Sequence, residues 1–344
     1  MITISLCMIV KNEEETLPTC LDSLKDLMDE MIIVDTGSTD RTKEIAASYG
    51  AQVYDFQWID DFSAARNYAF SKAGCEYIYS ADADEELDEE NIALFRKLKE
   101  RLDPEVEIVQ MYYTNQLSQK TVYNFDKELR AKLFKRLRPF VWIDPIHEMV
   151  RLDPVVYDSD IEIIHRPRND HGSRDLQTFK KALATMSGFS KRLHNMYARE
   201  LTMAGTKEDI LGAEEYFTET MTNANRSIDE VKEAACIVTR AARLRGDVPK
   251  MMKAAMKCVA SDGCAEVCYE LGLYYMEEKD YDEAIVWFYN AAYMTEAILD
   301  LHTGTDLPRI GLAACYKALG MPDEAAVYEA EAEEILNGPK GQVQ

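Results

Sequence analysis

The stretch YIYSADADEEL, residues 77–87, joins an apolar run directly to a cluster of acids. Its first three residues are typical of a buried strand. Like charges this close together raise one another's pKa unless a positive group lies between them. Asp82 and Asp84 are two residues apart, so on an extended chain both point to the same side. Such a pair can bind a hard divalent cation, which takes diphosphate oxygens as further ligands. The alternative is an acidic loop that only caps a helix beginning near Asp88.

Polar residues also follow two earlier apolar runs. Lys11 and Asn12 open KNEEE after ITISLCMIV, and Asp35 ends MIIVD before TGSTDRT. Asn12 can cap the helix that follows, whereas an acid at a strand tip, such as Asp35, can hydrogen-bond a nucleoside. The chain has no GxGxxG and no GxxxxGK[ST], which excludes dinucleotide and P-loop sites.

The elements that must position these residues alternate between strands and helices. We expect strands at residues 2–10, 31–35, 51–56 and 77–84, and helices at residues 14–28, 38–50 and 62–73. Continuous apolar strands separated by helices indicate a mostly parallel, Rossmann-like sheet covered on both faces. Ligands of such sheets bind beyond the carboxyl ends of the strands. The fold therefore predicts that the three polar clusters lie at one edge.

From about residue 175 the apolar period changes to that of helices. LGLYYMEEKDYDEA, residues 271–284, matches LAACYKALGMPDEA, residues 312–325, at an offset longer than the 34-residue tetratricopeptide repeat. The loop 299–308 can hold the excess. We expect an all-α, tetratricopeptide-like array, and a non-repeating helical bundle is the alternative.

Composition restricts the function further. The chain has 344 residues and a formal net charge of −23, which argues against a nucleic-acid partner. No apolar stretch approaches the roughly 20 residues of a membrane span, and the first ten residues lack a basic region, so we expect a cytoplasmic protein. Cys258, Cys264 and Cys268 form no CxxC pair, so we expect free buried thiols rather than a zinc site.

The ordered motifs together resemble the family 2 glycosyltransferases with the GT-A fold, over roughly residues 3–165. This resemblance implies a GT-A domain at residues 1–170, a linking helix at 171–194 and the helical domain at 195–337. It further implies a UDP-sugar donor and a Mn²⁺ or Mg²⁺ ion. By the same resemblance, Asp82 and Asp84 are the DxD motif that holds the metal. The predicted contacts of the donor are Lys11, Asn12, Asp35, Arg66 and Asp82.

Residues 129–150, LRAKLFKRLRPFVWIDPIHEMV, resemble a subgroup with an HE pair after an aromatic residue, which includes bacterial enzymes that glycosylate peptides such as glycocins. Glu148 is the predicted base, with Asp144 in reserve, and His147 positions the substrate. Trp142 holds the matching aromatic position in the donor site. His165, at the end of IEIIHRP, is a possible third metal ligand, and imidazole suits Mn²⁺ better than Mg²⁺.

A basic cluster in this subgroup region can neutralise the diphosphate leaving group. It comprises Arg130, Lys132 and Arg136, and the alternative is a solvated strand face. The resulting hypothesis is an inverting glycosyltransferase that acts on a peptide or protein acceptor, with a possible homodimer through the helices. One alternative acts on a saccharide or lipid-linked acceptor. Another is a non-enzymatic repeat protein with a vestigial GT-A domain. A nucleotidyltransferase would need a Gly- and Arg-rich first loop, which KNEEE is not.

Overall fold

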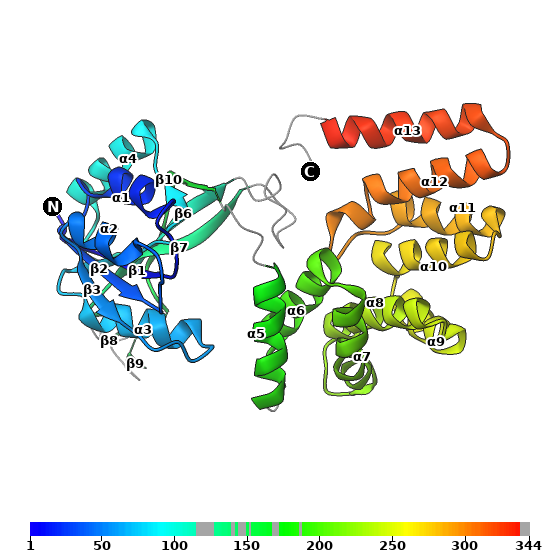
Figure 1. The fold of residues 1–344 in the computed structure, drawn as a ribbon, viewed down its shortest axis with the longest axis horizontal. Helices are drawn as coiled ribbons and strands as arrows, with labels where there is room; N and C mark the ends of the chain where they lie inside the picture. The colour runs from blue at the N-terminus through cyan, green and yellow to red at the C-terminus, as the bar shows by residue number, and fades with distance from the viewer. Residues whose placement is uncertain are drawn as a thin grey trace. The chain divides into compact units, whose positions relative to one another are not determined.

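A computed structural model describes residues 1–114, 127–138, 142–143, 149–150, 153–166, 172–185 and 188–337. The chain divides into two compact units, Met1–Asn169 and Asp170–Gln344 (Figure 1). The described part of the first unit is an α/β domain, and that of the second consists of helices, which confirms the predicted fold class. None of the described helices is long and apolar enough to cross a membrane.

The first unit is built on an eight-stranded sheet with the order β3-β2-β1-β4-β7-β6-β10-β5 among the described residues. Its strands are β1 (Ile4–Val10), β2 (Glu30–Asp35), β3 (Gln52–Asp55), β4 (Tyr77–Ser80), β5 (Glu85–Glu86), β6 (Ile108–Thr114), β7 (Glu128–Lys135) and β10 (Val156–His165). The first four strands are parallel, as predicted, whereas β7 is antiparallel to both β4 and β6. A separate ribbon pairs β8 (Trp142–Ile143) with β9 (Met149–Val150).

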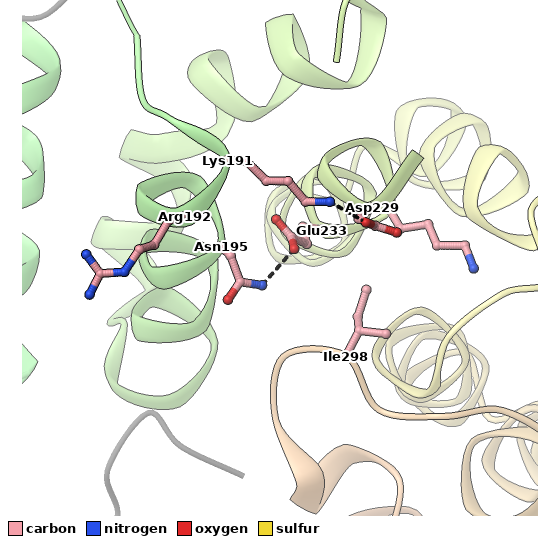
Figure 2. Close-up of a pocket in the computed structure, with 7 residues that line it drawn as sticks. Lys191, Arg192, Asn195, Asp229, Glu233 and Ile298 are labelled. Atoms are coloured by element: carbon pink, nitrogen blue, oxygen red, sulfur yellow. Dashed lines mark hydrogen bonds and ion pairs between the residues drawn. The ribbon is translucent and has the colours of Figure 1, made fainter. Parts of the chain in front are cut away.

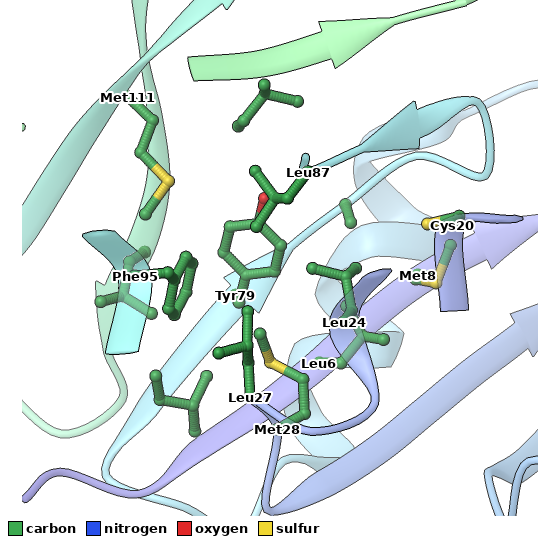
Figure 3. Packing of buried hydrophobic residues seen from close by; sticks show 14 of the residues in the cluster. Leu6, Met8, Cys20, Leu24, Leu27, Met28, Tyr79, Leu87, Phe95 and Met111 are labelled. Atoms are coloured by element: carbon green, nitrogen blue, oxygen red, sulfur yellow. The ribbon is translucent and has the colours of Figure 1, made fainter. Parts of the chain in front are cut away.

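Helices cover both faces of the sheet because side chains alternate along β1. Leu6 and Met8 are buried in a cluster with α1 (Leu17–Leu24) and α4 (Glu89–Arg101), while Cys7 is buried on the opposite face against α3 (Phe62–Lys72). Figure 3 shows the first cluster, in which the rings of Tyr79 and Phe95 meet edge to face at 5.3 Å. This apolar packing fixes the strands whose ends carry the polar residues.

The two helices nearest the predicted site are shorter than expected. Helix α1 starts at Leu17, with Pro18 in its first turn, where proline is favoured. Helix α2 (Thr42–Ser48) starts after Arg41, so Ser38 and Thr39 do not cap it. Its predicted end near Gly50 is confirmed by the left-handed backbone of that glycine, with φ at 79°.

The second unit is a series of helices. They are α5 (Gly172–Thr185), α6 (Lys191–Ala204), α7 (Lys207–Thr222), α8 (Ile228–Arg245), α9 (Val248–Val259), α10 (Ala265–Glu277), α11 (Tyr281–Tyr289), α12 (Asp306–Ala318) and α13 (Pro322–Asn337). The sequence repeat corresponds to two helical hairpins, α10–α11 and α12–α13. The excess residues between them form a π-helix (Asn290–Met294) and a 3₁₀-helix (Leu301–Thr303), so the insertion starts before the predicted loop.

Phe288 of α11 packs against glycines on both neighbouring helices. A Cβ atom placed on Gly272 of α10 or Gly311 of α12 would lie 2.6 or 2.8 Å from this ring, closer than real contacts allow. The two glycines therefore let three helices approach closely.

Candidate active site

The acids after β4 lie in a tight turn, in which the backbone N–H of Glu85 donates to the carbonyl of Asp82 at 3.2 Å. Ala81, Ala83 and Glu85 are buried, whereas Asp82 and Asp84 between them are partly exposed. Asp82 and Asp84 are thus both accessible, although they lie in a turn rather than on the extended chain that their spacing predicts. They lie beyond the carboxyl end of β4, at the same edge as the ends of β1 and β2, because the three strands are parallel.

Asp82 and Asp84 are each paired with a basic group from another element. The Arg66 guanidinium on α3 lies 2.7 Å from Asp82 Oδ1 and also donates to Ser80. Burial opposes ionisation of Asp82, but the Arg66 charge and then that of Lys132 hold the pKa of this carboxyl below its ordinary value. On the other side, His165 Nε2 at the end of β10 lies 3.1 Å from Asp84 Oδ2.

The next two acids, which the sequence analysis did not assign to the site, are also paired. Lys132 Nζ lies 2.7 Å from Glu85 Oε2, and both side chains are almost fully buried, at 8% and 2% exposure. Burial is the main cause of a raised pKa at Glu85, and Lys132 opposes it. Arg166 Nε lies 2.6 Å from Glu86. The four carboxylates of residues 82–86 can therefore lie close together, because each pairs with a different basic side chain. These basic side chains are Arg66, His165, Lys132 and Arg166.

Asp84 and His165 fit a divalent cation. In octahedral coordination with bonds of about 2.1 Å, neighbouring ligand atoms are about 3.0 Å apart. The 3.1 Å between His165 Nε2 and Asp84 Oδ2 agrees with this spacing. Pairing of β10 with β5 produces the approach, because His165 lies opposite Glu85. Asp82, the other predicted ligand, is held by Arg66 and does not form a close three-ligand group with the other two in this structure.

Asp35 lies at the tip of β2, as predicted, but its side chain is fully buried. Its Oδ1 accepts hydrogen bonds from the backbone N–H groups of Gly37 and Ser38, at 3.0 and 2.9 Å. Its Oδ2 is buried and has no hydrogen-bond partner among the described residues. The carboxylate therefore holds the turn after β2 with one oxygen, and the other remains able to accept a bond from a ligand.

Asn12 ties the loop after β1 to the loop after β2. Its Oδ1 accepts from Thr39 N at 2.8 Å, and its own N–H donates to Ser38 Oγ at 2.9 Å. Its backbone is left-handed, with φ at 56°, a conformation that asparagine tolerates. Asn12 is thus a loop connector rather than a helix cap, while the neighbouring Lys11 is exposed.

The structure separates the predicted basic cluster. Because β7 is antiparallel to β4, Leu133 lies opposite Tyr79 and Lys135 lies opposite Tyr77. Arg136 therefore lies at the amino end of β4, where its Nε donates to the carbonyl of Cys75. This position is a correction, because the sequence analysis placed Arg136 with the diphosphate.

The remaining members of the cluster lie nearer the acids. Lys132 is occupied by Glu85, and Arg130 stacks on the ring of Tyr113 at 3.9 Å. Three predicted catalytic residues, Asp144, His147 and Glu148, lie outside the described residues. Trp142 belongs to β8, and its side chain also lies outside the description.

Each unit contains a pocket that bears on the search for the active site. A pocket of about 190 Å³ beside Asp84 lies between the start of α1 and β5 and is lined by Thr16, Thr19, Cys20, Ala83, Asp84, Glu85, Glu86 and Arg166. A larger pocket of about 670 Å³ lies wholly in the helical unit. The larger volume alone does not mark the reaction centre, because none of the predicted donor or metal residues lines it.

Figure 2 shows the larger pocket, which α6, α8 and the segment at Ile298 enclose. Lys191 pairs with Asp229 at 2.6 Å, and Asn195 donates to Glu233 at 2.6 Å. Arg192 and Lys232 complete the lining. The walls thus present charges of both signs beside an apolar residue.

Comparison with known proteins relates the first unit to a known family. Residues 5–151, which lie in the first unit, match the model of Glycosyl transferase family 2. The chain is 55% identical over 87 residues to a TPR repeat-containing protein of Synechococcus elongatus, which covers 25% of this chain and 22% of that protein. An uncharacterized glycosyltransferase of Rickettsia typhi is 29% identical over 174 residues, which are 47% of this chain and 55% of that one.

The SPbeta prophage-derived glycosyltransferase SunS of Bacillus subtilis is 38% identical over 104 residues, which are 29% of this chain and 24% of that protein. The chain thus spans between 22% and 55% of the length of these relatives. Among solved structures, glucosyl-3-phosphoglycerate synthase from Mycobacterium tuberculosis aligns with a TM-score of 0.39 and 17% identity over 54% of this chain and 78% of that chain.

Proposed function

We propose that this protein is an inverting glycosyltransferase that transfers a sugar from a UDP-sugar to a peptide or protein, with Mn²⁺ or Mg²⁺ at the donor site. One observation carries this proposal. In the unit that matches the Glycosyl transferase family 2 model, the Asp84–His165 pair lies beside the Arg66–Asp82 pair, beyond the carboxyl end of β4.

Different residues would contact different parts of the donor. Asp84 and His165 would hold the cation, which when bound supplies positive charge to the diphosphate. Arg66 is 38% exposed, so its guanidinium can turn from Asp82 to a phosphate oxygen. Asp35 would accept a hydrogen bond from the nucleoside through its free Oδ2. Lys132 takes a different role from the predicted one, because it holds Glu85, the residue that directly follows Asp84.

Transfer needs a displacement at the anomeric carbon. The acceptor oxygen or sulfur forms a bond to this carbon while the bond to the diphosphate oxygen breaks, and the electron pair leaves with UDP. The acceptor proton passes to a base, which we assign to Glu148 from the motif resemblance. A thiol acceptor would need less help than a hydroxyl, because its pKa is about 8.5.

We assign binding of the acceptor to the helical unit. Helical repeats form concave surfaces suited to extended peptides. The pocket at Lys191, Asp229 and Glu233 combines both charges with the apolar Ile298, which suits a peptide with mixed side chains. Because the two units belong to one chain, a peptide held there is present at high effective concentration near the sugar.

The donor half is tested by UDP release from UDP-sugars without acceptor, and by calorimetry of UDP with and without Mn²⁺. Asp84→Asn should lower UDP affinity with metal by about tenfold to a hundredfold and abolish the effect of EDTA. Asp22→Asn is the matched control, because Asp22 is an exposed acid of the same unit that pairs with Lys25. Equal affinity of the unchanged protein with and without EDTA would refute the metal role.

The acceptor half needs separate variants. Asp229→Lys reverses one charge of the helical pocket and should raise KM for the acceptor peptide while leaving donor hydrolysis unchanged. Glu329→Lys reverses an exposed charge of α13, which is outside the pocket, and serves as its control. Unchanged KM in Asp229→Lys, with transfer intact, would place acceptor binding elsewhere.

A further inference from the structure

Three cysteines that are distant in the sequence meet in the core of the helical unit. Cys264 Sγ lies 3.3 Å from Cys236 Sγ and 3.4 Å from Cys258 Sγ. All three are free and almost fully buried, with at most 3% of their surface exposed. They come from α8, α9 and the residue before α10, so that three separate segments bring them together.

A buried carboxylate faces the same point. Glu266 is 3% exposed, and its ligand atom lies within 4.8 Å of those of Cys236 and Cys264. Its Oε1 accepts hydrogen bonds from the backbone N–H groups of residues 298, 299 and 300. Its Oε2 is buried and has no hydrogen-bond partner among the described residues. A buried carboxylate is costly unless a positive group or a proton neutralises it.

The sequence analysis expected Cys258, Cys264 and Cys268 to be buried thiols, and all three are buried. It considered Cys258, Cys264 and Cys268 and found no pairs typical of zinc sites. In the structure, Cys268 contributes no thiol to the cluster, whereas Cys236, which is 28 residues before Cys264, does. Only the packing of α8 against α10 shows this combination.

We propose that Cys236, Cys258, Cys264 and Glu266 form a structural zinc site in the helical unit. Zinc takes four ligands in a tetrahedron, and thiolate and carboxylate are both among its usual protein ligands. With Zn–S bonds of about 2.3 Å, neighbouring sulfurs are about 3.8 Å apart, so Cys264 must move about 0.5 Å away from the other two sulfurs. Cys258 must also move toward the other ligands, because it is not in the group whose ligand atoms all lie within 4.8 Å of one another. The thiols release their protons as the ion binds.

The site has a structural consequence for the pocket in Figure 2. Glu266 would bind the ion through Oε2 while Oε1 keeps the three N–H groups of residues 298–300. Ile298 lines the pocket. Zinc would therefore fix this wall of the pocket as well as the junction of α8, α9 and α10. The proposal does not depend on sugar transfer.

The test uses the full chain, purified in reducing buffer without chelator from zinc-supplemented cells. Elemental analysis should find about one zinc per chain. The reduced, metal-free protein should bind Co²⁺ with the charge-transfer absorption of cobalt–thiolate bonds. Zinc should raise its melting temperature, because the ion binds the folded state. Glu266→Gln keeps the shape and one acceptor oxygen, so it should fold and lower zinc affinity at least about tenfold.

Two controls separate this site from other metal binding. Cys268→Ser changes a buried thiol of the same helix and should retain zinc. Asp84→Asn should also retain zinc, while it loses the metal of the donor site. The proposal is overturned if the reduced wild-type protein binds neither zinc nor cobalt through thiolates. It is equally overturned if folded Cys264→Ser and Glu266→Gln bind zinc as tightly as the wild type.

Discussion

Replacing Lys132 by methionine should destabilise the α/β unit in a way that depends on pH. The variant keeps the length of the side chain but leaves Glu85 buried without its cation, which lies 2.7 Å away in the native protein. Removing one partner of a buried ion pair typically costs about 3–5 kcal/mol. The protein can avoid part of this cost only if Glu85 takes up a proton.

The pH dependence follows from that proton. Burial already raises the pKa of Glu85 above its ordinary value, and loss of Lys132 raises it further. A group with a raised folded-state pKa favours folding at low pH, and this contribution is lost as pH rises through the folded-state value. A difference of one bound proton between the folded and unfolded states changes the free energy of unfolding by about 1.4 kcal/mol per pH unit. As the pH rises from about 5.5 to about 7.5, the free energy of unfolding of Lys132→Met should therefore fall by up to about 2.7 kcal/mol relative to that of the wild type.

Tryptophan fluorescence can measure this loss in one unit. The chain has three tryptophans, and Trp287→Phe leaves only Trp58 and Trp142, both in the first unit. Urea unfolding in this background then follows the α/β unit separately from the helices. The double variant Lys132→Met with Glu85→Gln should show no such pH dependence, because the titrating group is gone.

Lys25→Met is the matched control. Lys25 also lies 2.8 Å from an acid, Asp22, but the two side chains are 46% and 57% exposed. Its loss should cost much less than the loss of Lys132, because solvent screens an exposed pair, and it should not vary between the two pH values. If Lys132→Met behaves like Lys25→Met, the Glu85 pair is not a buried ion pair in solution, and the reasoning is wrong.

Three further predictions concern other groups. Despite burial, the N–H of Ser227 and the charge of Arg226 hold the pKa of Glu230 at about 2. The contribution of this carboxylate to the free energy of unfolding should therefore be present above about pH 4.5 and be lost toward about pH 2. Glu230→Gln should remove up to about 3 kcal/mol of stability at neutral pH, and acid titrations followed by circular dichroism measure the difference. Asp35→Ala should lower both UDP affinity and the melting temperature, whereas Asp35→Asn, which keeps Oδ1 for the turn, should lower mainly UDP affinity in calorimetry. His165→Asn should weaken Mn²⁺ more than Mg²⁺, since imidazole suits Mn²⁺ better, and equal losses in metal titrations would contradict its role as a ligand.

The sequence predicted the parts of the fold that depend on local patterns. Apolar runs identified the parallel strands, although the strand predicted at residues 77–84 ends at Ser80 and a turn with Asp82 and Asp84 follows it. The repeat identified the α10–α11 and α12–α13 hairpins. Each of these follows from a period within one segment, which a sequence displays directly.

Features that depend on strand direction or distant packing were not predictable in this way. The reversed direction of β7 moved Arg136 to the opposite end of β4 and left Lys132 beside Glu85. The one available signal was that Glu85 occupies an inward position of a period-two segment, where an acid needs a buried partner. Nothing in the spacing connects Cys236 with Cys264.

The packing of Phe288 against Gly272 and Gly311 also limits how this chain can change over time. Because one ring contacts both glycines, an alanine at either position clashes with the same side chain. A smaller residue at position 288 would relieve either clash, but it would open space at the other interface. Substitutions at these three positions are therefore coupled, and related chains that carry a larger residue at one glycine should have changed the ring as well.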